Sequence, residues 1–365
     1  MRAVCAICSA MNRRRFLRFL SIPLAFSGTA AAWASWRAGR NPYYSGPVTD
    51  HFDGVQFHSP GGSPLQGIGR LLQWHLAGGK ESWPETYPAP PQVKPAPRIT
   101  GSKFAVTFVG HASYLLQTGG LNILIDPVWS ERAGPMNLLG PKRVTPAGIR
   151  FDDLPDIDAV LITHNHYDHL DIATLQRLNT RHHPRFITAL GNDTIIRSAA
   201  PDARAEAFDW GRHAQLSDTV SVHLEPCNHW SARGLLDRRM ALWAAFIIKT
   251  PAGNIYHIGD TGFGDGLVFR AAREKHGPFR LANIPIGAYE PRWFMSEQHV
   301  NPEEAVAIFQ ASGAAAAIGH HWGAFRLADE GIERPLEALR SALEKSGIDP
   351  QRFRGFRPGE VFEAA

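Results

Sequence analysis

The sequence predicts an α+β fold in which β-sheets are layered with helices on the outside. From about residue 103 onward, apolar runs typical of strands outnumber helical patterns, which become frequent only toward the C-terminus. The composition, with 44% hydrophobic and 20% charged residues, is ordinary for a soluble globular protein and provides ample material for a buried core. A chain of 365 residues has room for one large domain with appendages or for two domains.

The predicted strands follow one another from residue 104. Short apolar runs bounded by turn residues indicate buried strands, and the first two are expected to pair with each other. The third, at 121–127, ends at a proline. The strands are expected at residues 104–110, 114–117, 121–127, 160–163, 186–190, 220–226, 240–250, 254–258 and 281–285.

Three helices are expected beside these strands. Residues 172–178 follow the strand at 160–163, and residues 335–346 form a closing helix. Between them, a helix begins after Asn301, whose side chain suits an N-cap and is followed by a proline at the first helical position.

The first 100 residues divide into two segments that precede the folded domain expected at 101–365. Residues 1–40 resemble a bacterial twin-arginine export signal, with an arginine-rich motif, a short apolar stretch and a small-residue cleavage pattern. The apolar stretch is short against the roughly 20 residues of a spanning helix, so a periplasmic or exported protein is expected. Membrane association through an uncleaved segment is the alternative. Residues 41–100, rich in proline and glycine, predict extended, wrapping chain.

The distribution of charge argues against a nucleic-acid partner. The formal net charge is +4, but residues 1–34 hold five arginines and no acid, which leaves the rest of the chain at −1. A folded domain without a net basic footprint lacks the usual electrostatic basis for binding nucleic acid. Cys5 and Cys8 lie in the predicted signal and Cys227 stands alone, so no disulfide framework is expected.

The loop at residues 163–171 carries the strongest functional signal. It contains the pattern H-x-H-x-D-H directly after an apolar run that predicts a buried strand. On extended backbone His164 and His166 point the same way, because side chains alternate with period two. They are expected to bind one metal ion, while Asp168 and His169, further round the turn, face a second. Imidazole and carboxylate ligands together suit Zn²⁺, with iron or manganese as alternatives.

Three further candidate ligands follow later predicted strands. His229 comes just after one strand, and Asp260 follows another, where flanking glycines allow close backbone approach. The pair His320–His321 follows residues 315–319. One histidine of this pair, with the other candidates, completes seven ligands, the number that two zinc ions sharing one carboxylate need.

These motifs together resemble the metallo-β-lactamase superfamily, whose fold is an αββα four-layer sandwich of two mixed sheets with metals at one edge. The resemblance is closer still to N-acylphosphatidylethanolamine-hydrolysing phospholipase D and its bacterial relatives, and it covers roughly residues 100–360. The segment IPIGAYEPRWFM at 284–295 is far more specific than the metal motif, which the whole superfamily shares. Other matching stretches are residues 109–112, 126–128, 140–143, 163–171, 259–262, 298–300, 302–305 and 321–323.

The resemblance implies a binuclear zinc site with phosphodiesterase activity. Carried over by position, His164, His166 and His229 bind one zinc, Asp168, His169 and His321 bind the other, and Asp260 bridges them. His321 is chosen over its neighbour because it directly precedes Trp322-Gly323. The implied mechanism uses a zinc-bridging hydroxide, with Asp168 and Asp260 as catalytic residues, to release N-acylethanolamine and phosphatidic acid. The implied partners are a phospholipid or small phosphodiester and a membrane surface.

Five more residues are candidates for the substrate side of this site. Arg292 is expected near a phosphate, with an internal salt bridge as the alternative. His111 lies in a strand-turn segment, where a role behind the metal ligands or a purely structural one are the alternatives. The five candidates are His111, Tyr289, Arg292, Trp293 and His299.

Other functions stay open at this point. A lactonase or another metal-dependent hydrolase of the same fold would act on a small soluble, phosphorylated substrate. A drug-hydrolysing β-lactamase is disfavoured, because Asp260 stands where many such enzymes have cysteine. A non-catalytic, metal-stabilised binding protein is disfavoured because structural zinc sites are usually closed four-ligand cages. The sequence gives neither the acyl-chain preference nor the oligomeric state.

Overall fold

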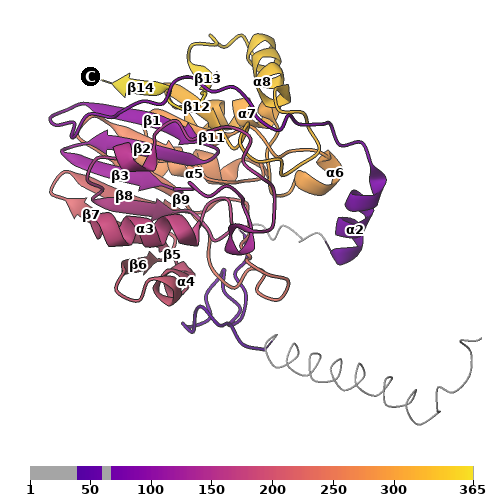
Figure 1. Ribbon diagram of the computed structural model, residues 1–365, viewed down its shortest axis with the longest axis horizontal. Coiled ribbons are helices and arrows are strands. Elements are labelled where there is room, and N and C mark those ends of the chain that lie inside the picture. Colours follow the sequence, from indigo (N-terminus) through magenta and orange to yellow (C-terminus); the bar gives the residue numbers. More distant parts are fainter. Residues whose placement is uncertain (1–38, 60–66, 365) are drawn as a thin grey trace, which may run out of the picture.

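Two seven-stranded mixed sheets pack face to face and form the centre of the molecule (Figure 1). The computed structural model describes residues 39–59 and 67–364. The strand order is β14-β1-β2-β3-β4-β5-β6 in the first sheet and β13-β12-β11-β10-β9-β8-β7 in the second. Each sheet is antiparallel on one side and parallel on the other, with the change at β3 in the first and at β10 in the second. This arrangement confirms the predicted αββα sandwich.

The strands are short and mostly begin and end close to the predicted boundaries. The first sheet contains β1 (Phe104–Gly110), β2 (Ser113–Thr118), β3 (Leu121–Ile125), β4 (Ala159–Ile162), β5 (Arg185–Ala189), β6 (Arg204–Phe208) and β14 (Val361–Ala364). The second contains β7 (His213–Ser217), β8 (Val220–Glu225), β9 (Ala245–Lys249), β10 (Asn254–His257), β11 (Phe279–Pro285), β12 (Ala316–His320) and β13 (Phe353–Gly355). The strand expected at 240–250 therefore starts five residues late, at Ala245.

Helices cover the outer faces of both sheets (Figure 1). Against the first sheet lie α3 (Ile172–His182) and α4 (Asn192–Ala199), and against the second lie α5 (Leu267–His276), α7 (Pro302–Ser312) and α8 (Arg334–Lys345). The predicted cap of α7 is present as a reciprocal pair, in which Asn301 accepts from the Glu304 amide and Glu304 accepts from the Asn301 amide. Two helices, α2 (Ile68–Ala77) and α6 (Arg292–Met295), and two 3₁₀ turns at Pro135–Asn137 and Phe151–Asp153 complete the described elements.

The strands are apolar on both faces because both faces are covered. Leu115 and Val160 point outward and pack in one cluster with Leu175 of α3. Their chain neighbours Leu116 and Leu161 point inward and join the larger cluster between the sheets. This alternation explains why the sequence shows continuous apolar runs rather than polar alternation. Truncating one such residue to alanine is expected to cost about 2–5 kcal/mol.

The segment before the sheets contributes to the core as well. Phe52 and Phe57 are buried, contact each other with ring centroids 4.5 Å apart, and belong to the cluster between the sheets. The extended chain expected at 41–100 is interrupted by α2, a helix that the sequence analysis did not anticipate. The predicted export signal lies outside the described residues, apart from its last two positions. Within the described ranges, no helix has the length and apolar character to cross a membrane.

Candidate metal centre

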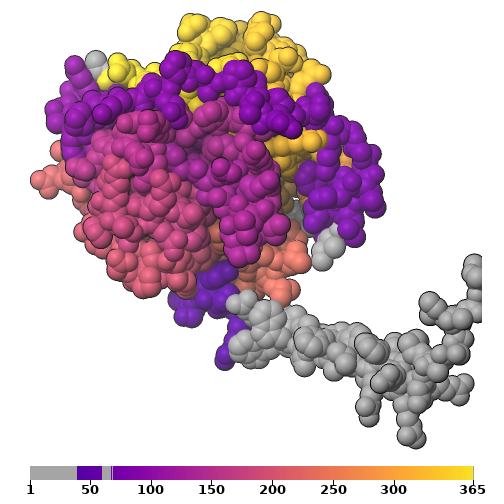
Figure 2. Space-filling model, viewed as in Figure 1, coloured from indigo at the N-terminus to yellow at the C-terminus, as the bar shows by residue number. Residues whose placement is uncertain are grey.

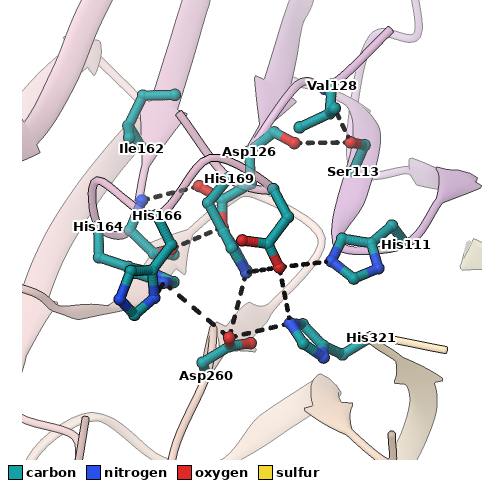
Figure 3. A network of polar contacts seen from close by, with 12 residues as sticks. His111, Ser113, Asp126, Val128, Ile162, His164, His166, His169, Asp260 and His321 are labelled. Carbon is teal, nitrogen blue, oxygen red and sulfur yellow. Dashed lines mark hydrogen bonds and ion pairs between the residues drawn. The ribbon is translucent and has the colours of Figure 1, made fainter. Parts of the chain in front are cut away.

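All predicted metal ligands meet at one edge of the sandwich (Figure 3). They lie on loops that directly follow β4, β8, β10 and β12. After β4 the chain turns back on itself, since the amides of His169 and Leu170 donate to the His166 carbonyl. The loop after β10 passes close to this turn at Gly259, which has a φ of +70°, and a Cβ there would lie 3.0 Å from Thr163 Cγ2. Glycine is therefore required for the two loops to approach each other.

Three histidines form the first cluster. His166 Nδ1 lies 2.9 Å from His164 Nε2 and 3.2 Å from His229 Nε2. His229 Nδ1 donates to the Gln298 carbonyl, so its Nε2 carries a lone pair that points into the cluster. Three imidazole nitrogens that converge in this way are suited to hold a zinc or similar ion.

The second cluster consists of Asp168, His169 and His321. Asp168 Oδ2 lies 3.3 Å from His321 Nε2 and 3.6 Å from His169 Nε2. All three side chains are nearly fully buried. One carboxylate oxygen and two imidazole nitrogens again converge, and Figure 3 shows His321 on the side of Asp260 opposite His164.

Asp260 joins the two clusters. Its Oδ2 lies 2.9 Å from His321 Nε2 and 3.2 Å from His169 Nε2. The same oxygen lies 3.8 Å from His229 Nε2 and 3.9 Å from His164 Nε2. A single carboxylate is thus positioned to be shared by two ions, one in each cluster.

The donor atoms fit metal ions better than they fit each other. Among the described residues, His169 Nε2, His321 Nε2 and Asp260 Oδ1 are buried side-chain atoms without a hydrogen-bond partner of acceptable geometry. Leaving such atoms unsatisfied costs roughly 1–3 kcal/mol each, and more when they are charged. Metal ions in the two clusters would satisfy the two histidine nitrogens and use the mixed imidazole and carboxylate donors that zinc prefers.

The electrostatics of the protein alone separate the two clusters. In the first, burial lowers the pKa of His166 to about 4 and that of His229 well below its usual value, so both rings are neutral and ready to bind a metal. In the second, burial acts to lower the pKa of His321, but Asp260 and Asp168 outweigh it and raise the pKa to about 9. Burial acts to raise the pKa of Asp260, yet His169 and His321 hold it well below the ordinary range. Metal binding to the second cluster must therefore displace protons.

Asp126, to which the sequence analysis gave no role, orients two of the ligands. Its carboxylate accepts from the Thr163 amide at 2.8 Å, the Thr163 hydroxyl at 2.6 Å and His169 Nδ1 at 2.7 Å. Because the Thr163 hydroxyl donates to Asp126, its oxygen accepts from His164 Nδ1 at 2.9 Å. Both histidines thereby present Nε2 to the metal side. In the sequence, Asp126 lies near the end of the strand predicted at 121–127 and begins the family-like stretch 126–128, but neither feature assigned it a role.

His111 lies behind the ligands rather than on the substrate side. Its Nε2 is 2.9 Å from Asp168 Oδ2, and its carbonyl accepts from the His321 amide at 2.8 Å. The ring is fully buried and its backbone has a φ of +59°, which is uncommon for a residue with a Cβ. His111 therefore holds two ligands of the second cluster at once. His320, by contrast, stacks on His257 with centroids 5.4 Å apart and stays outside both clusters.

A cavity of about 550 Å³ opens above the metal ligands and is lined mostly by apolar atoms. It reaches His166, Asp168, Asp260 and His321, and His299 faces it as expected. Its outer wall comes from segments distant in the sequence, including α2, the loop after β8, and α6. The lining residues are Gly67, Leu71, Trp74, Ala133, His166, Tyr167, Asp168, Trp230, Gly234, Leu235, Arg238, Asp260, Ala288, Phe294, Met295, Gln298, His299, His321 and Leu327.

Three predicted substrate residues do not line this cavity within the described part of the chain: Tyr289, Arg292 and Trp293. Arg292 instead donates to Glu304 at 2.7 Å and to the His299 carbonyl at 2.8 Å, which is the internal salt bridge considered as the alternative. The buried carboxylate of Glu330 accepts hydrogen bonds from the backbone amides of Ala288 and Glu290, and these bonds fix the conformation of the loop that follows β11. As a result, the neighbouring residues Ala288, Phe294 and Met295 face the cavity.

Comparison with known proteins agrees with this architecture. A family model described as "Beta-lactamase superfamily domain" matches residues 121–322. An uncharacterized protein of Mycobacterium tuberculosis is 37% identical over 286 residues, which cover 76% of this chain and 74% of the relative. N-acyl-phosphatidylethanolamine-hydrolyzing phospholipase D 1 of Caenorhabditis elegans is 34% identical over 269 residues, 71% of this chain and 75% of that protein. Among solved structures, an isothiocyanate hydrolase from Delia radicum gut bacteria shares the fold, with a TM-score of 0.57, 19% identity, and coverage of 71% of this chain and 98% of that one.

Proposed function

Because this chain belongs to the metallo-β-lactamase superfamily of metal-dependent hydrolases, we propose that it is a zinc-dependent phosphodiesterase acting on N-acylphosphatidylethanolamine or a closely similar phospholipid. The observation that carries the proposal is the position of Asp260, whose Oδ2 lies within 4 Å of ring nitrogens from both histidine clusters at the floor of an apolar cavity. The products would be phosphatidic acid and N-acylethanolamine.

The chain's own residues have distinct tasks in this reaction. Two zinc ions in the clusters would supply a nucleophile at neutral pH and neutralise charge on the phosphoryl oxygens. Asp168 is held by His111 and faces the cavity, where it is positioned to orient the attacking group. His299 lines the cavity beside Asp260, with its Nδ1 3.9 Å from Oδ2, and burial lowers its pKa to about 3. A neutral ring there can accept a hydrogen bond from the substrate or donate one to it.

The cavity walls suit hydrocarbon chains. Leu71 and Trp74 of α2 face Phe294 of α6, and the rings of Trp74 and Phe294 stack at 5.0 Å. A head group held on the metal ligands would leave its acyl chains against these side chains. Burying one methylene there contributes about 0.8 kcal/mol.

We also propose that the face around the cavity mouth meets a membrane surface. Segments that contribute to the cavity lining also expose large apolar side chains, and exposed apolar surface is typical of sites that meet a membrane or a protein partner. Figure 2 shows one of these segments, α2, as part of a purple lobe at the right of the molecule. We call this set the apolar rim; it comprises Leu72, Leu76, Met136, Leu138, Leu139, Leu235 and Leu236.

Mass spectrometry of the reaction products tests the proposal. The zinc-loaded full chain is incubated with vesicles that contain N-acylphosphatidylethanolamine, in water enriched in ¹⁸O. Attack at phosphorus places the label in phosphatidic acid, and Asp168→Asn gives no product above background. Intact lipid with a fully metal-loaded protein would refute this substrate and favour a lactone or a small soluble ester. Label in a fatty acid would indicate acyl hydrolysis instead.

A further inference from the structure

We propose that Arg238 binds an anionic group of the ligand beside the metal centre, so that the cavity selects anionic amphiphiles over uncharged ones of the same size. The inference rests on the proposed function, because it concerns the same cavity and names the residue that recognises the negative charge of the substrate. Arg238 belongs to the loop between β8 and β9, which also carries the metal ligand His229.

The position of Arg238 is fixed relative to the metal centre through one aromatic ring. Its guanidinium carbon lies 4.6 Å from the centroid of the Trp230 ring. Trp230 also contacts the candidate metal ligand His166, whose ring centroid lies 4.6 Å from that of Trp230. All three residues line the cavity. The same indole ring thus contacts both the guanidinium and a histidine of the first cluster.

Arg238 differs from the basic residue that precedes it in this loop. Arg233 lies over Tyr167 and donates to the carbonyls of Asn165 and Leu170, at 3.0 and 2.8 Å, so it fixes the metal-binding loop. Arg238, half-buried at the wall, is the sole arginine or lysine among the cavity-lining residues of the described ranges. A guanidinium has five N–H donors, so it is able to contact protein groups and a ligand at the same time.

The chemistry of this pair specifies the ligand class. An arginine supported on an aromatic face keeps its planar fork in place and binds phosphate or carboxylate oxygens through paired hydrogen bonds. In the same cavity, Leu71, Trp74 and Phe294 provide an apolar wall. The cavity therefore matches a molecule with one anionic head and a hydrocarbon tail, and a long uncharged ester gains nothing from Arg238.

Calorimetric titration of the zinc-loaded full chain with octyl phosphate and with 1-octanol separates charge recognition from tail binding. Arg238→Met keeps much of the apolar stem and removes the charge. It is expected to weaken octyl phosphate binding by about 10- to 100-fold and to change 1-octanol binding by less than about 2-fold. Arg238→Lys restores part of the affinity, because it keeps the charge but not the planar fork.

The matched control is Arg354→Met. Arg354 also lies over an aromatic ring, Phe356 at 4.8 Å, but on β13 and outside the cavity lining. Its substitution should leave both titrations unchanged. Equal octyl phosphate binding by the wild type and Arg238→Met would overturn the proposal. So would a parallel loss of both ligands, which would make Arg238 part of the wall only.

This test is independent of the reaction. A protein that binds octyl phosphate through Arg238 but leaves N-acylphosphatidylethanolamine intact would keep the inference and refute the proposed substrate. A protein that cleaves the lipid while Arg238→Met binds octyl phosphate normally would keep the proposed function and refute the inference.

Discussion

The metal edge and the cavity wall above it are built in different ways. The ligands of the metal edge sit on short loops after buried strands, and each is held by further contacts, such as those of Asp126 and His111. The wall comes from segments far apart in the sequence. Its helix α2 is joined to the body through Trp74, which donates to Asp329 at 2.9 Å and stacks on Phe294. We therefore infer that the metal edge sets the reaction type, whereas the wall, which is assembled from distant segments, sets substrate choice.

The largest effect is expected from Asp260, on which the two clusters converge. Asp260→Ala removes the carboxylate shared between them and leaves Asp168 as the one carboxylate that faces both His169 Nε2 and His321 Nε2. We expect phosphodiester hydrolysis to fall by at least about 1,000-fold and zinc content to fall below two per chain. Elemental analysis and hydrolysis assays measure both. The control is Asp265→Asn, an exposed carboxylate five residues away. Full activity in Asp260→Ala would remove the basis for a shared ligand.

The second effect concerns the stability of the metal-free protein. His321 titrates in the folded chain with a pKa raised to about 9, against about 6.5 in the unfolded chain. Its ion pairs with Asp260 and Asp168 therefore stabilise the fold fully below pH 6.5, and this contribution is lost as pH rises to 9. We expect the metal-free protein to lose about 3 kcal/mol of unfolding free energy over this range. Zinc replaces the proton, so the zinc-loaded protein should lose much less.

Urea unfolding at pH 6.5, 7.5 and 9, with and without a chelator, measures this difference. His321→Gln should flatten the profile of the metal-free protein. A metal-free profile that is flat or rises with pH in the wild type would contradict the charge arrangement described for the second cluster.

A substitution of Asp126 tests whether its hydrogen bonds to Thr163 and His169 are needed to orient the metal ligands. Asp126→Asn keeps the size of the side chain but replaces a double acceptor by a group that also donates, which disturbs the tautomers of His164 and His169. Zinc affinity should fall by about 10- to 100-fold. Competition with a chromophoric chelator measures it, with Asp156→Asn, at an exposed side chain, as the control. Unchanged affinity would show that the ligands need no such support.

The smallest effect is expected at the apolar rim. Leu76→Asp, at a side chain that is 84% exposed, should lower binding to phospholipid vesicles by about 10-fold, because a charge replaces a buried leucine at the interface. Leu267→Asp changes another exposed leucine, at the start of α5 and outside the rim, and should bind vesicles like the wild type. Vesicle sedimentation compares the two. Equal losses in both variants would mean that the rim has no special affinity for lipid.

The sequence predicted which side chains gather at one edge because its signals are local. The histidine-rich loop follows β4 directly, and the other ligands follow β8, β10 and β12, so strand ends alone bring them to one edge. The family resemblance was needed to choose His321 over His320. Asp126 escaped attention because a single carboxylate after a strand is common and its partners lie elsewhere in the sequence.

The cavity wall was predicted poorly because its contacts are long-range. Helix α2 is short, and glycines adjoin both its ends, which hid its periodicity. Arg292 lies in the segment that most resembles the family, yet its guanidinium forms an ion pair with Glu304, twelve residues later. Arg238 gave no signal of its own, since only the fold brings it beside Trp230 and His166. Strand β14 pairs with β1 although most of the chain lies between them in the sequence, and no local pattern reveals such a pairing.

Native mass spectrometry of the full chain titrated with zinc tests the central claim most directly, namely that two metal ions share Asp260. The account predicts two zinc ions per wild-type chain, with hydrolysis that rises as the second ion binds, and no active two-zinc species for Asp260→Ala. Saturation at one ion with full hydrolysis, or an Asp260→Ala chain that still holds two ions and is active, would contradict it.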